Sequence, residues 1–429
     1  MIQENHAQTL GRLLKQACDT FAEHVLTVEE EKPVTYRQTA LHAQALVRQL
    51  YETGLRAGDA VGICLPLCAS YAAALIAVLS LGGVAVPIDP RCPARKAVQM
   101  LRRAGAVCAI GGHGQLEGEI PILEPDKVPE LGESCWPGQL EWSVSPDSPA
   151  FCFFTSGSLG EPKQVFLTHR GICHTVQAKR QVLELCEDDV VACTFSPGFV
   201  ASIWCVAATM LSGARLVVYQ GSSDDWNARC RTWEQATIIA LTPSALQAVL
   251  GLEQAQQHPI ALKESRYLVL TGEEVTGALL DRYFRSHSVP LINAYGATEC
   301  SDDVLHARID HPLPSGSIPV GRPIPHTQVK IMQEGKPAAA GQTGEIWISG
   351  PSVVAGYVGQ EQEENEKFCC QDGETWYRSG DLGSMDEKGI VYYLGRMDDQ
   401  IKRAGYKIRL HELTDQALAL EGIEEAYAM

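Results

Sequence analysis

The sequence has almost none of the features that mark zinc-binding, disulfide-rich or membrane-spanning proteins. None of its 15 cysteines belongs to a Cys-x-x-Cys pair or has histidine at the spacing of a structural zinc site. Disulfide frameworks belong to small secreted chains, so reduced and mostly buried thiols are expected. The N-terminus has no basic segment followed by an apolar one, and the apolar stretch 71–88 is too short and too interrupted by glycine to span a membrane. We therefore expect a soluble, cytoplasmic protein with no membrane partner.

Positive charge is also scarce. The 429 residues include 35 lysines and arginines against 52 aspartates and glutamates, which gives a formal net charge of −17. Nucleic-acid affinity depends mainly on lysine and arginine neutralising phosphates, so this balance argues against a nucleic-acid partner. At roughly 100–200 residues per domain, the length allows two to four packed units, each able to bury a core.

The order of apolar segments predicts the fold class. Residues 40–51 and 70–81 have helical periodicity, and short apolar runs bounded by glycine lie between such segments. Strands that alternate with helices indicate parallel α/β layers, and the same alternation returns between residues 190 and 292. After about Pro312 the sequence changes to short, glycine-rich strand-like pieces. We expect an α/β protein with two related α/β subdomains followed by a small β-rich subdomain.

A loop rich in glycine and hydroxyl side chains is the most informative segment. It follows an apolar strand-like run and lies within residues 151–171. Its members, with the lysine just after it, are Thr155, Ser156, Gly157, Ser158, Leu159, Gly160 and Lys163. Glycines let backbone N–H groups approach an anion, hydroxyls donate further hydrogen bonds, and lysine neutralises charge, so this loop suits phosphate. The spacing is not that of a P-loop, and a plain surface turn would account equally well for the loop taken alone.

The order of residues in this loop resembles the phosphate-binding signature of the adenylate-forming enzymes. This superfamily comprises acyl-CoA synthetases, luciferases and the adenylation domains of nonribosomal peptide synthetases. Leu159 stands where threonine is usual, and Gln164 where glycine is usual. Further segments are similar to motifs of that family in the same order along the chain: 293–299, 344–346, 377–381 and 395–402. Residues 81–93 resemble the peptide-synthetase branch in particular.

The resemblance implies both a domain organisation and a reaction. Residues 1–397 would form the N-terminal adenylation core, and residues 398–429 the hinge and the beginning of a C-terminal α+β subdomain. The family converts a carboxylic acid and ATP, with Mg²⁺, into an acyl-adenylate and pyrophosphate. The acyl group then passes to a thiol. In the peptide-synthetase branch this is the phosphopantetheine thiol of a peptidyl or acyl carrier protein, as in the biosynthesis of peptide antibiotics.

The matched motifs carry implied roles in binding the nucleoside. By resemblance, Tyr295 would stack on adenine, Asn293 would hydrogen-bond the adenine amino group, and Gly272 would lie beside the base. Asp381 would accept both ribose hydroxyls, and Arg396 would lie near the ribose and phosphates, because carboxylates and guanidinium groups suit these partners. Taken singly, each of these residues is more often a core aromatic, a turn residue or a surface ion pair, and only the ordered set indicates a site.

The phosphate and metal roles are assigned in the same way. Thr298 would contact the α-phosphate, and Glu299 would hold Mg²⁺, which neutralises charge on the leaving oxygens. We therefore expect Thr298, Glu299, Lys163 and Arg396 to act in catalysis. The glycine-rich loop would bind the phosphates. His169 and Arg170 could be taken for a catalytic pair, but the resemblance places them at the start of the following helix, in a structural role.

The acid-binding pocket departs from the peptide-synthetase pattern. That branch has aspartate two residues after Gly198, where it pairs with the substrate α-ammonium, whereas this chain has Val200. A buried ammonium without a counter-charge would cost several kcal/mol, so an ordinary α-amino acid should bind poorly. The pocket residues carried over from the family are Val200, Ala201, Trp204, Ala240, Val269, Thr271, Ala294, Asp302 and Asp303.

Two classes of substrate fit this pocket. An α-keto, α-hydroxy or aryl acid needs no counter-charge, which agrees with Val200. A β-amino or other displaced-amine acid would use Asp302 or Asp303 instead. We favour the first class, because a pair of aspartates at a helix start commonly faces water.

The segment after the predicted hinge is short. Only 31 residues follow Asp398, and the lysine with which the family's C-terminal subdomain contacts the carboxylate lies beyond that point, so slow adenylation is expected. An artificial cut or a natural interruption by an inserted domain, such as the ketoreductase of synthetases that activate α-keto acids, would explain the end equally well. The alternative functions are a nucleotide-binding module without turnover and an acyl-CoA synthetase, which would release AMP with free coenzyme A.

Overall fold

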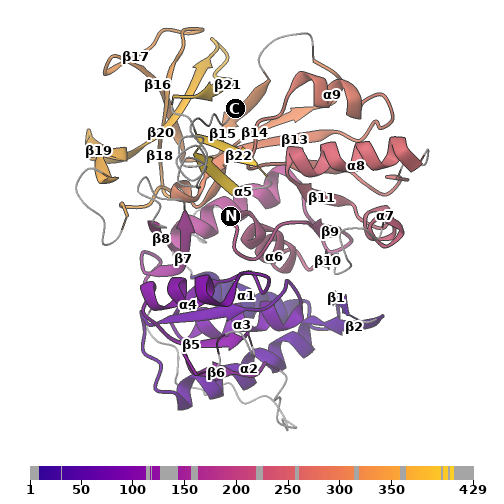
Figure 1. Ribbon diagram of the computed structural model, residues 1–429, viewed down its shortest axis with the longest axis vertical. Coiled ribbons are helices and arrows are strands. Elements are labelled where there is room, and N and C mark those ends of the chain that lie inside the picture. Colours follow the sequence, from indigo (N-terminus) through magenta and orange to yellow (C-terminus); the bar gives the residue numbers. More distant parts are fainter. Residues whose placement is uncertain are drawn as a thin grey trace, which may run out of the picture. The chain divides into compact units, whose positions relative to one another are not determined.

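The structure is a computed structural model, drawn as a ribbon in Figure 1. The chain forms two compact units. The structure describes residues 9–29, 31–112, 116, 118–125, 144–155, 163–218, 226–256, 260–313, 318–357, 364–397, 400–403 and 406–409. The first unit comprises residues 1–153, 164–240 and 262–265, and the second comprises 154–163, 241–261 and 266–429. Most of the predicted segment 398–429 lies outside the described residues. Strands alternate with helices over most of the chain, which confirms the α/β class.

A six-stranded sheet forms the core of the first unit. Its strand order is β6-β5-β3-β4-β7-β8. The strands are β3 (Ala60–Cys64), β4 (Val84–Pro87), β5 (Ala106–Gly111), β6 (Ile122–Leu123), β7 (Pro149–Thr155) and β8 (Lys163–Thr168). Strands β3, β4 and β5 pair in parallel, and every residue of β3 and β4 is buried. Parallel strands covered on both faces require continuous apolar runs, which is why these segments do not alternate.

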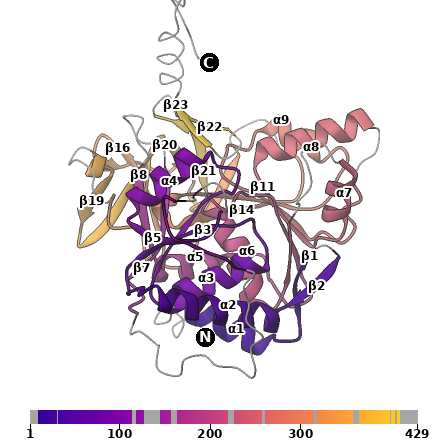
Figure 2. The same ribbon diagram turned by 60° about the horizontal axis from the view of Figure 1, so that its bottom comes forward.

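Three helices pack together in the same unit and lie side by side in Figure 2. They are α1 (Leu10–Thr20), α2 (Tyr36–Glu52) and α3 (Ala69–Ser80); α4 (Ala94–Arg103) packs beside β5. Thr35 begins α2 with a capping box, in which its hydroxyl accepts from the N–H of Gln38 and the Gln38 side chain accepts from the N–H of Thr35. Ten of the twelve residues of α3 are buried, so α3 is the central helix of this group.

A second group of parallel strands in the first unit has the order β10-β9-β11. It consists of β9 (Val190–Cys193), β10 (Arg215–Val218) and β11 (Ile238–Leu241), with the short hairpin β1 (Val25–Glu29) and β2 (Lys32–Thr35) elsewhere in the unit. Helices α5 (His169–Val182) and α6 (Ala201–Leu211) pack against each other, and α7 (Trp226–Glu234) follows β10. All eleven residues of α6 are buried. The repeated strand–helix pattern agrees with the related α/β subdomains predicted from the sequence.

The second unit has a sheet that changes from parallel to antiparallel. Its order is β12-β13-β14-β15-β21-β20-β18-β16-β17, with β19 beside β20. The strands are β12 (Tyr267–Leu270), β13 (Leu291–Ala297), β14 (Asp302–Ile309), β15 (Pro319–Pro323), β16 (Gln328–Gln333), β17 (Lys336–Pro337), β18 (Gly344–Ser349), β19 (Phe368–Gln371), β20 (Glu374–Met385) and β21 (Val391–Arg396). A separate hairpin is formed by β22 (Gln400–Arg403) and β23 (Tyr406–Arg409). Helices α8 (Pro243–Gln256) and α9 (Gly277–Tyr283) pack together, and two short 3₁₀ turns are η2 (Thr298–Cys300) and η3 (Glu364–Lys367).

Antiparallel pairing begins at β14, before the change in composition near Pro312. Strand β12 pairs with β13 in parallel, whereas β13 pairs with β14 in antiparallel register. The β-rich character predicted for the later part of the chain is present from β15 to β21. No helix within the described residues is long and apolar enough to cross a membrane.

The tight connection between β13 and β14 depends on Gly296. The register shifts between Tyr295 and Gly296, and Ser301 has a left-handed backbone with φ of 58°. A Cβ atom at position 296 would lie 2.0 Å from the backbone oxygen of Asp302 and 2.6 Å from the Cα of Asp303. Such distances are shorter than any van der Waals contact, so only glycine fits between the two strands.

We predict that Gly296→Ala lowers the free energy of unfolding by about 1–3 kcal/mol or more, because the added methyl group forces the two strands apart. Denaturant unfolding followed by circular dichroism measures this change. The matched control is Gly277→Ala in α9, where a Cβ atom meets nothing within 4 Å and alanine favours the helix. Equal transition midpoints for Gly296→Ala and Gly277→Ala would show that the strands tolerate the methyl group.

Candidate active site

A buried carboxylate, that of Asp381, brings together three of the residues predicted to bind the nucleoside. Asp381 on β20 lies opposite Arg396 on β21 in the strand register, and Arg396 Nη1 donates to Asp381 Oδ1 at 2.6 Å. The hydroxyl of Tyr295, on β13, donates to the other oxygen of the same carboxylate. Three residues to which the resemblance assigned separate nucleoside-binding roles, Tyr295, Asp381 and Arg396, are therefore in contact with one another within the second unit.

Burial and the adjacent carboxylate keep the Tyr295 hydroxyl protonated. Burial, followed by the nearby negative charge of Asp381, raises the pKa of Tyr295 well above its usual value. The phenol consequently remains a hydrogen-bond donor at all physiological pH values. Arg396 supplies the positive charge that a buried carboxylate requires, and its second hydrogen bond, 2.9 Å to the backbone oxygen of Ser379, fixes the guanidinium plane.

The turn that carries Asp381 is held by a second motif. Glu345 Oε1 accepts from the backbone N–H of Gly380 at 3.0 Å. The Ser379 hydroxyl donates to the backbone oxygen of Ile346 at 2.7 Å and accepts from the N–H of Asp381 at 3.0 Å. The motifs 344–346 and 377–381, which were matched separately in the sequence, are thus neighbours on β18 and β20. Glu345 and Ser379 position Asp381, a role that no single motif reveals.

Asn293 lies within β13, opposite the last residue of β12 in their parallel pairing, and Gly272 follows β12 by two residues. The Asn293 amide donates to the backbone oxygen of Pro319 at 2.8 Å. This bond uses the amide nitrogen and leaves the side-chain oxygen as an acceptor. An acceptor suits the role that the resemblance assigns to Asn293, a hydrogen bond from the adenine amino group. Gly272 has φ of 85°, a left-handed conformation that keeps the chain turning directly after β12.

Glu299 is the centre of a second buried network. Its side chain lies in the turn η2 after Thr298, the residue is 2% exposed, and Tyr357 donates its hydroxyl to Glu299 Oε1 at 2.7 Å. Lys163, at the start of β8, places its ammonium 5.0 Å from the centre of the Tyr357 ring. Burial excludes the interpretation of Glu299 as a solvated surface carboxylate. Tyr357, which the sequence did not single out, connects two of the predicted catalytic residues.

The buried carboxylate of Glu299 suits Mg²⁺ that is also bound by phosphates and water, rather than a metal ion held by protein side chains alone. No group of three or more His, Cys, Asp and Glu side chains that could hold a metal occurs among the described residues. Mg²⁺ commonly uses one or two carboxylates together with substrate phosphates and water, so one buried glutamate is sufficient. Thr155 is buried at the end of β7. The predicted phosphate-loop residues Ser156, Gly157, Ser158 and Gly160 lie outside the described residues.

The predicted acid-pocket residues of the first unit lie at two places. Val200 and Ala201 begin helix α6, and Trp204 is buried one turn later with the Lys179 ammonium 4.9 Å from its ring centre. Ala240 is buried in β11. The first turn of α6, all of which the structure describes, holds no acidic side chain. The helix's own first turn therefore adds no negative charge to the positive end of its dipole.

The acid-pocket residues of the second unit include two buried aspartates. Val269 and Ala294 are buried, Thr271 follows β12, and its hydroxyl donates to Asp303 Oδ1. Asp302 and Asp303 are 4% and 2% exposed. They begin strand β14, so the expectation that they face water at a helix start is wrong. The reason is the bulge at Gly296 and the turn at residues 298–301, which send the chain back as a strand.

His169 and Arg170 are engaged within the first unit. Burial lowers the pKa of His169 to about 4, and its Nδ1 accepts from the backbone N–H of Leu10 at 3.2 Å. Arg170 forms an ion pair with Asp147, with a Nε to Oδ1 distance of 2.6 Å. The pair begins helix α5, as predicted, and both contacts join segments distant in the sequence, which agrees with a structural role.

Comparison with known proteins decides the family. Residues 14–358 match the family described as AMP-binding enzyme. The chain belongs to this family. It is 30% identical to bacitracin synthase 3 of Bacillus licheniformis over 98% of this chain and 7% of that protein. It is 27% identical to syringomycin synthase SyrB1 of Pseudomonas syringae pv. syringae over 94% of this chain and 67% of that protein. The predicted superfamily and its peptide-synthetase branch are confirmed, and the chain spans less than a tenth of bacitracin synthase 3.

Solved structures of adenylation proteins share the fold. An artificially fused adenylation–PCP di-domain, NpsA-ThdA from Klebsiella oxytoca, matches with a TM-score of 0.85 at 24% identity, over 98% of this chain and 85% of that one. The N-terminal subdomain of Klebsiella oxytoca NpsA in complex with 3-hydroxybenzoyl-AMSN matches with a TM-score of 0.79 at 25% identity, over 91% of this chain and 100% of that one. The described chain therefore has the architecture of an adenylation core, as the sequence predicted.

We predict that Tyr357→Phe raises the Mg²⁺ concentration needed for ATP binding by about tenfold, because Glu299 loses the hydrogen bond that orients it. Calorimetric titration of ATP at a series of Mg²⁺ concentrations measures this shift. The matched control is Tyr283→Phe, which removes another buried phenol, the donor to the backbone oxygen of Val289 at 2.9 Å. The role assigned to Tyr357 is contradicted if Tyr357→Phe, like the control Tyr283→Phe, needs the same Mg²⁺ concentration for ATP binding as the original protein.

Proposed function

We propose that this chain activates a carboxylic acid with ATP and Mg²⁺ and loads it onto the phosphopantetheine thiol of a carrier protein in nonribosomal peptide synthesis. The observation that carries the proposal is the buried cluster of Tyr295, Asp381 and Arg396, since it unites an aromatic ring, a carboxylate and a guanidinium group in one place. Membership in the AMP-binding enzyme family supports the adenylation chemistry. The adenylation and PCP domains named in the structural relatives support a carrier protein as partner.

The residues of the second unit provide the groups that this reaction needs. An oxygen of the acid attacks the α-phosphorus of ATP, the bond to the β-phosphate breaks, and pyrophosphate leaves. Asp381 retains acceptor capacity for ribose hydroxyls beside its bonds from Tyr295 and Arg396, because each carboxylate oxygen has two lone pairs. Thr298 and Lys163 would contact the phosphates. Glu299 would hold Mg²⁺, which supplies neutralisation of the phosphate charge when it is bound.

The start of α6 supports an acid without an α-amino group. Val200 carries no charge, and the helix N-terminus next to it is the positive end of the dipole. An ammonium placed beside Val200 would lose its hydration without gaining a counter-charge from that side chain, so the substrate class that fits is an α-keto, α-hydroxy or aryl acid. The 3-hydroxybenzoyl analogue bound to NpsA, a protein of 25% identity, supports inclusion of aryl acids.

The buried aspartates of the second unit support a second class. Asp302 and Asp303 are shielded from water, and buried carboxylates normally have a specific polar partner. Thr271 is such a partner for Asp303. If these carboxylates also bind substrate, the acid would carry a displaced amine, as a β-amino acid does.

Acid-dependent pyrophosphate exchange tests these proposals. The assay uses this chain alone and this chain joined to the C-terminal subdomain of a relative, with α-keto, α-hydroxy, aryl, β-amino and α-amino acids. We predict exchange with a member of the first class, and that Val200→Asp moves the preference toward α-amino acids by about tenfold or more because it restores the counter-charge.

Each contrary outcome has a distinct meaning. Exchange with a β-amino acid that is lost in Asp302→Asn or Asp303→Asn would assign the second class. ATP binding without exchange for any acid, with the C-terminal subdomain supplied, would identify a nucleotide-binding module without turnover. Release of AMP with free coenzyme A would identify an acyl-CoA synthetase.

A further inference from the structure

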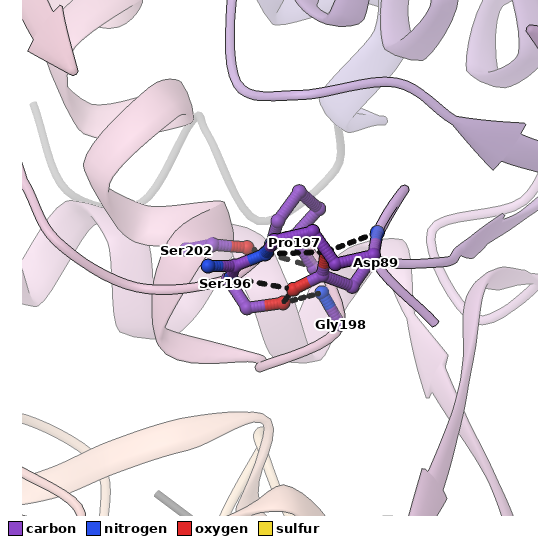
Figure 3. A network of polar contacts seen from close by, with 6 residues as sticks. Asp89, Ser196, Pro197, Gly198 and Ser202 are labelled. Atoms are coloured by element: carbon purple, nitrogen blue, oxygen red, sulfur yellow. Dashed lines mark hydrogen bonds and ion pairs between the residues drawn. The ribbon is translucent and has the colours of Figure 1, made fainter. Parts of the chain in front are cut away.

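The segment that resembles the peptide-synthetase branch contacts the loop that leads into α6. Asp89 lies in the segment 81–93, and Ser196 lies in the loop 195–200, which we call the α6 loop. The Ser196 hydroxyl donates to Asp89 Oδ2, and 107 residues separate the two in sequence (Figure 3). Both residues belong to the first unit.

The contact continues through the α6 loop as a series of hydrogen bonds. Ser196 Oγ accepts from the N–H of Gly198 at 3.2 Å, and the backbone oxygen of Ser196 accepts from the N–H of Phe199 at 3.0 Å. Farther along, the Ser202 hydroxyl donates to the backbone oxygen of Pro197 at 3.3 Å (Figure 3). The conformation of the loop is thus linked to one carboxylate outside it.

The Asp89 carboxylate is a charged acceptor. Burial raises its pKa, but hydrogen bonds from Arg91 and Ser196 outweigh burial and hold the pKa of Asp89 below its usual value. The Asp89 side chain is 15% exposed, whereas that of its ion-pair partner Arg91 is 83% exposed. A hydrogen bond to an ionised, largely buried acceptor is stronger than one between neutral groups, so Ser196 is held firmly.

The α6 loop also approaches the backbone of the segment 81–93. The backbone N of Asp89 lies 3.9 Å from the place that a Cβ atom of residue 198 would occupy, so the two segments approach closely at Gly198. Two residues after Gly198, the chain reaches Val200 and Ala201, the proposed wall of the acid pocket. A shift of Ser196 would therefore move this wall directly.

We propose that Asp89 is a positioning residue for the acid substrate, which acts through Ser196 to fix the α6 loop and the start of α6. The inference rests on the proposed function, because it takes Val200 and Ala201 as the acid-binding wall. Asp89 itself contacts neither the acid nor ATP in this proposal. Its loss should therefore weaken binding of the acid and leave binding of ATP unchanged.

Steady-state pyrophosphate exchange with Asp89→Ala, Ser196→Ala and the double variant tests the proposal. We expect each single variant to raise KM for the acid by about tenfold with KM for ATP unchanged, since displaced binding groups lose orientation. The double variant should be no worse than either single one, because both changes remove the same interaction. Ser196→Thr, which keeps the hydroxyl, should have the KM for the acid of the original protein rather than that of Ser196→Ala.

The control and the contrary outcomes separate this inference from the proposed function. Arg91→Ala removes the exposed partner of Asp89 but keeps its bond from Ser196, and it should change KM for the acid less than twofold. The inference alone is overturned when the original protein exchanges pyrophosphate but Ser196→Ala leaves KM for the acid unchanged, or when KM for acid and ATP rise together. Absence of acid-dependent exchange when the original protein is joined to the C-terminal subdomain of a relative overturns the proposed function and this inference with it.

Discussion

Burial of the Asp381 carboxylate is the constraint on which the second unit depends. A charge removed from water needs a counter-charge and hydrogen bonds, and here Arg396, Tyr295 and the backbone of its own turn supply them. These partners come from β13, β20 and β21, so one carboxylate fixes three strands relative to one another. A group held this rigidly is suited to bind ribose, because little conformational freedom remains to be lost on binding.

The charges near the two sets of proposed acid-pocket residues would favour different substrates. The first unit offers an apolar Val200 at a positive helix end, whereas the second offers Asp302 and Asp303 buried at the start of β14. The Thr271 hydroxyl donates a hydrogen bond to one oxygen of Asp303 but brings no positive charge to it. If these residues line the acid pocket as proposed, a neutral head group suits Val200 in the first unit, and an ammonium suits the aspartates of the second. The identity of the acid follows from which set of groups contacts it.

The sequence was sufficient for the fold class and for the residues that meet at Asp381, because ordered motifs carry topology with them. It could not show that Glu345 holds the turn of Asp381, that Tyr357 orients Glu299, or that Asp89 reaches Ser196. Each of these contacts joins segments whose proximity is created only by folding. The error at Asp302 and Asp303 has a similar cause, since the left-handed turn at Ser301 and the close approach at Gly296 determine their burial.

The most direct test of the account is calorimetric binding of ATP and of 2′,3′-dideoxy-ATP to the original protein, Asp381→Asn and a control, Glu374→Gln, which changes an exposed carboxylate on the same strand. The account predicts that Asp381→Asn weakens ATP binding by about tenfold or more but scarcely changes binding of the dideoxy nucleotide, because the ribose hydroxyls and the carboxylate form one interaction. Equal ATP affinity in Asp381→Asn and the original protein would contradict it.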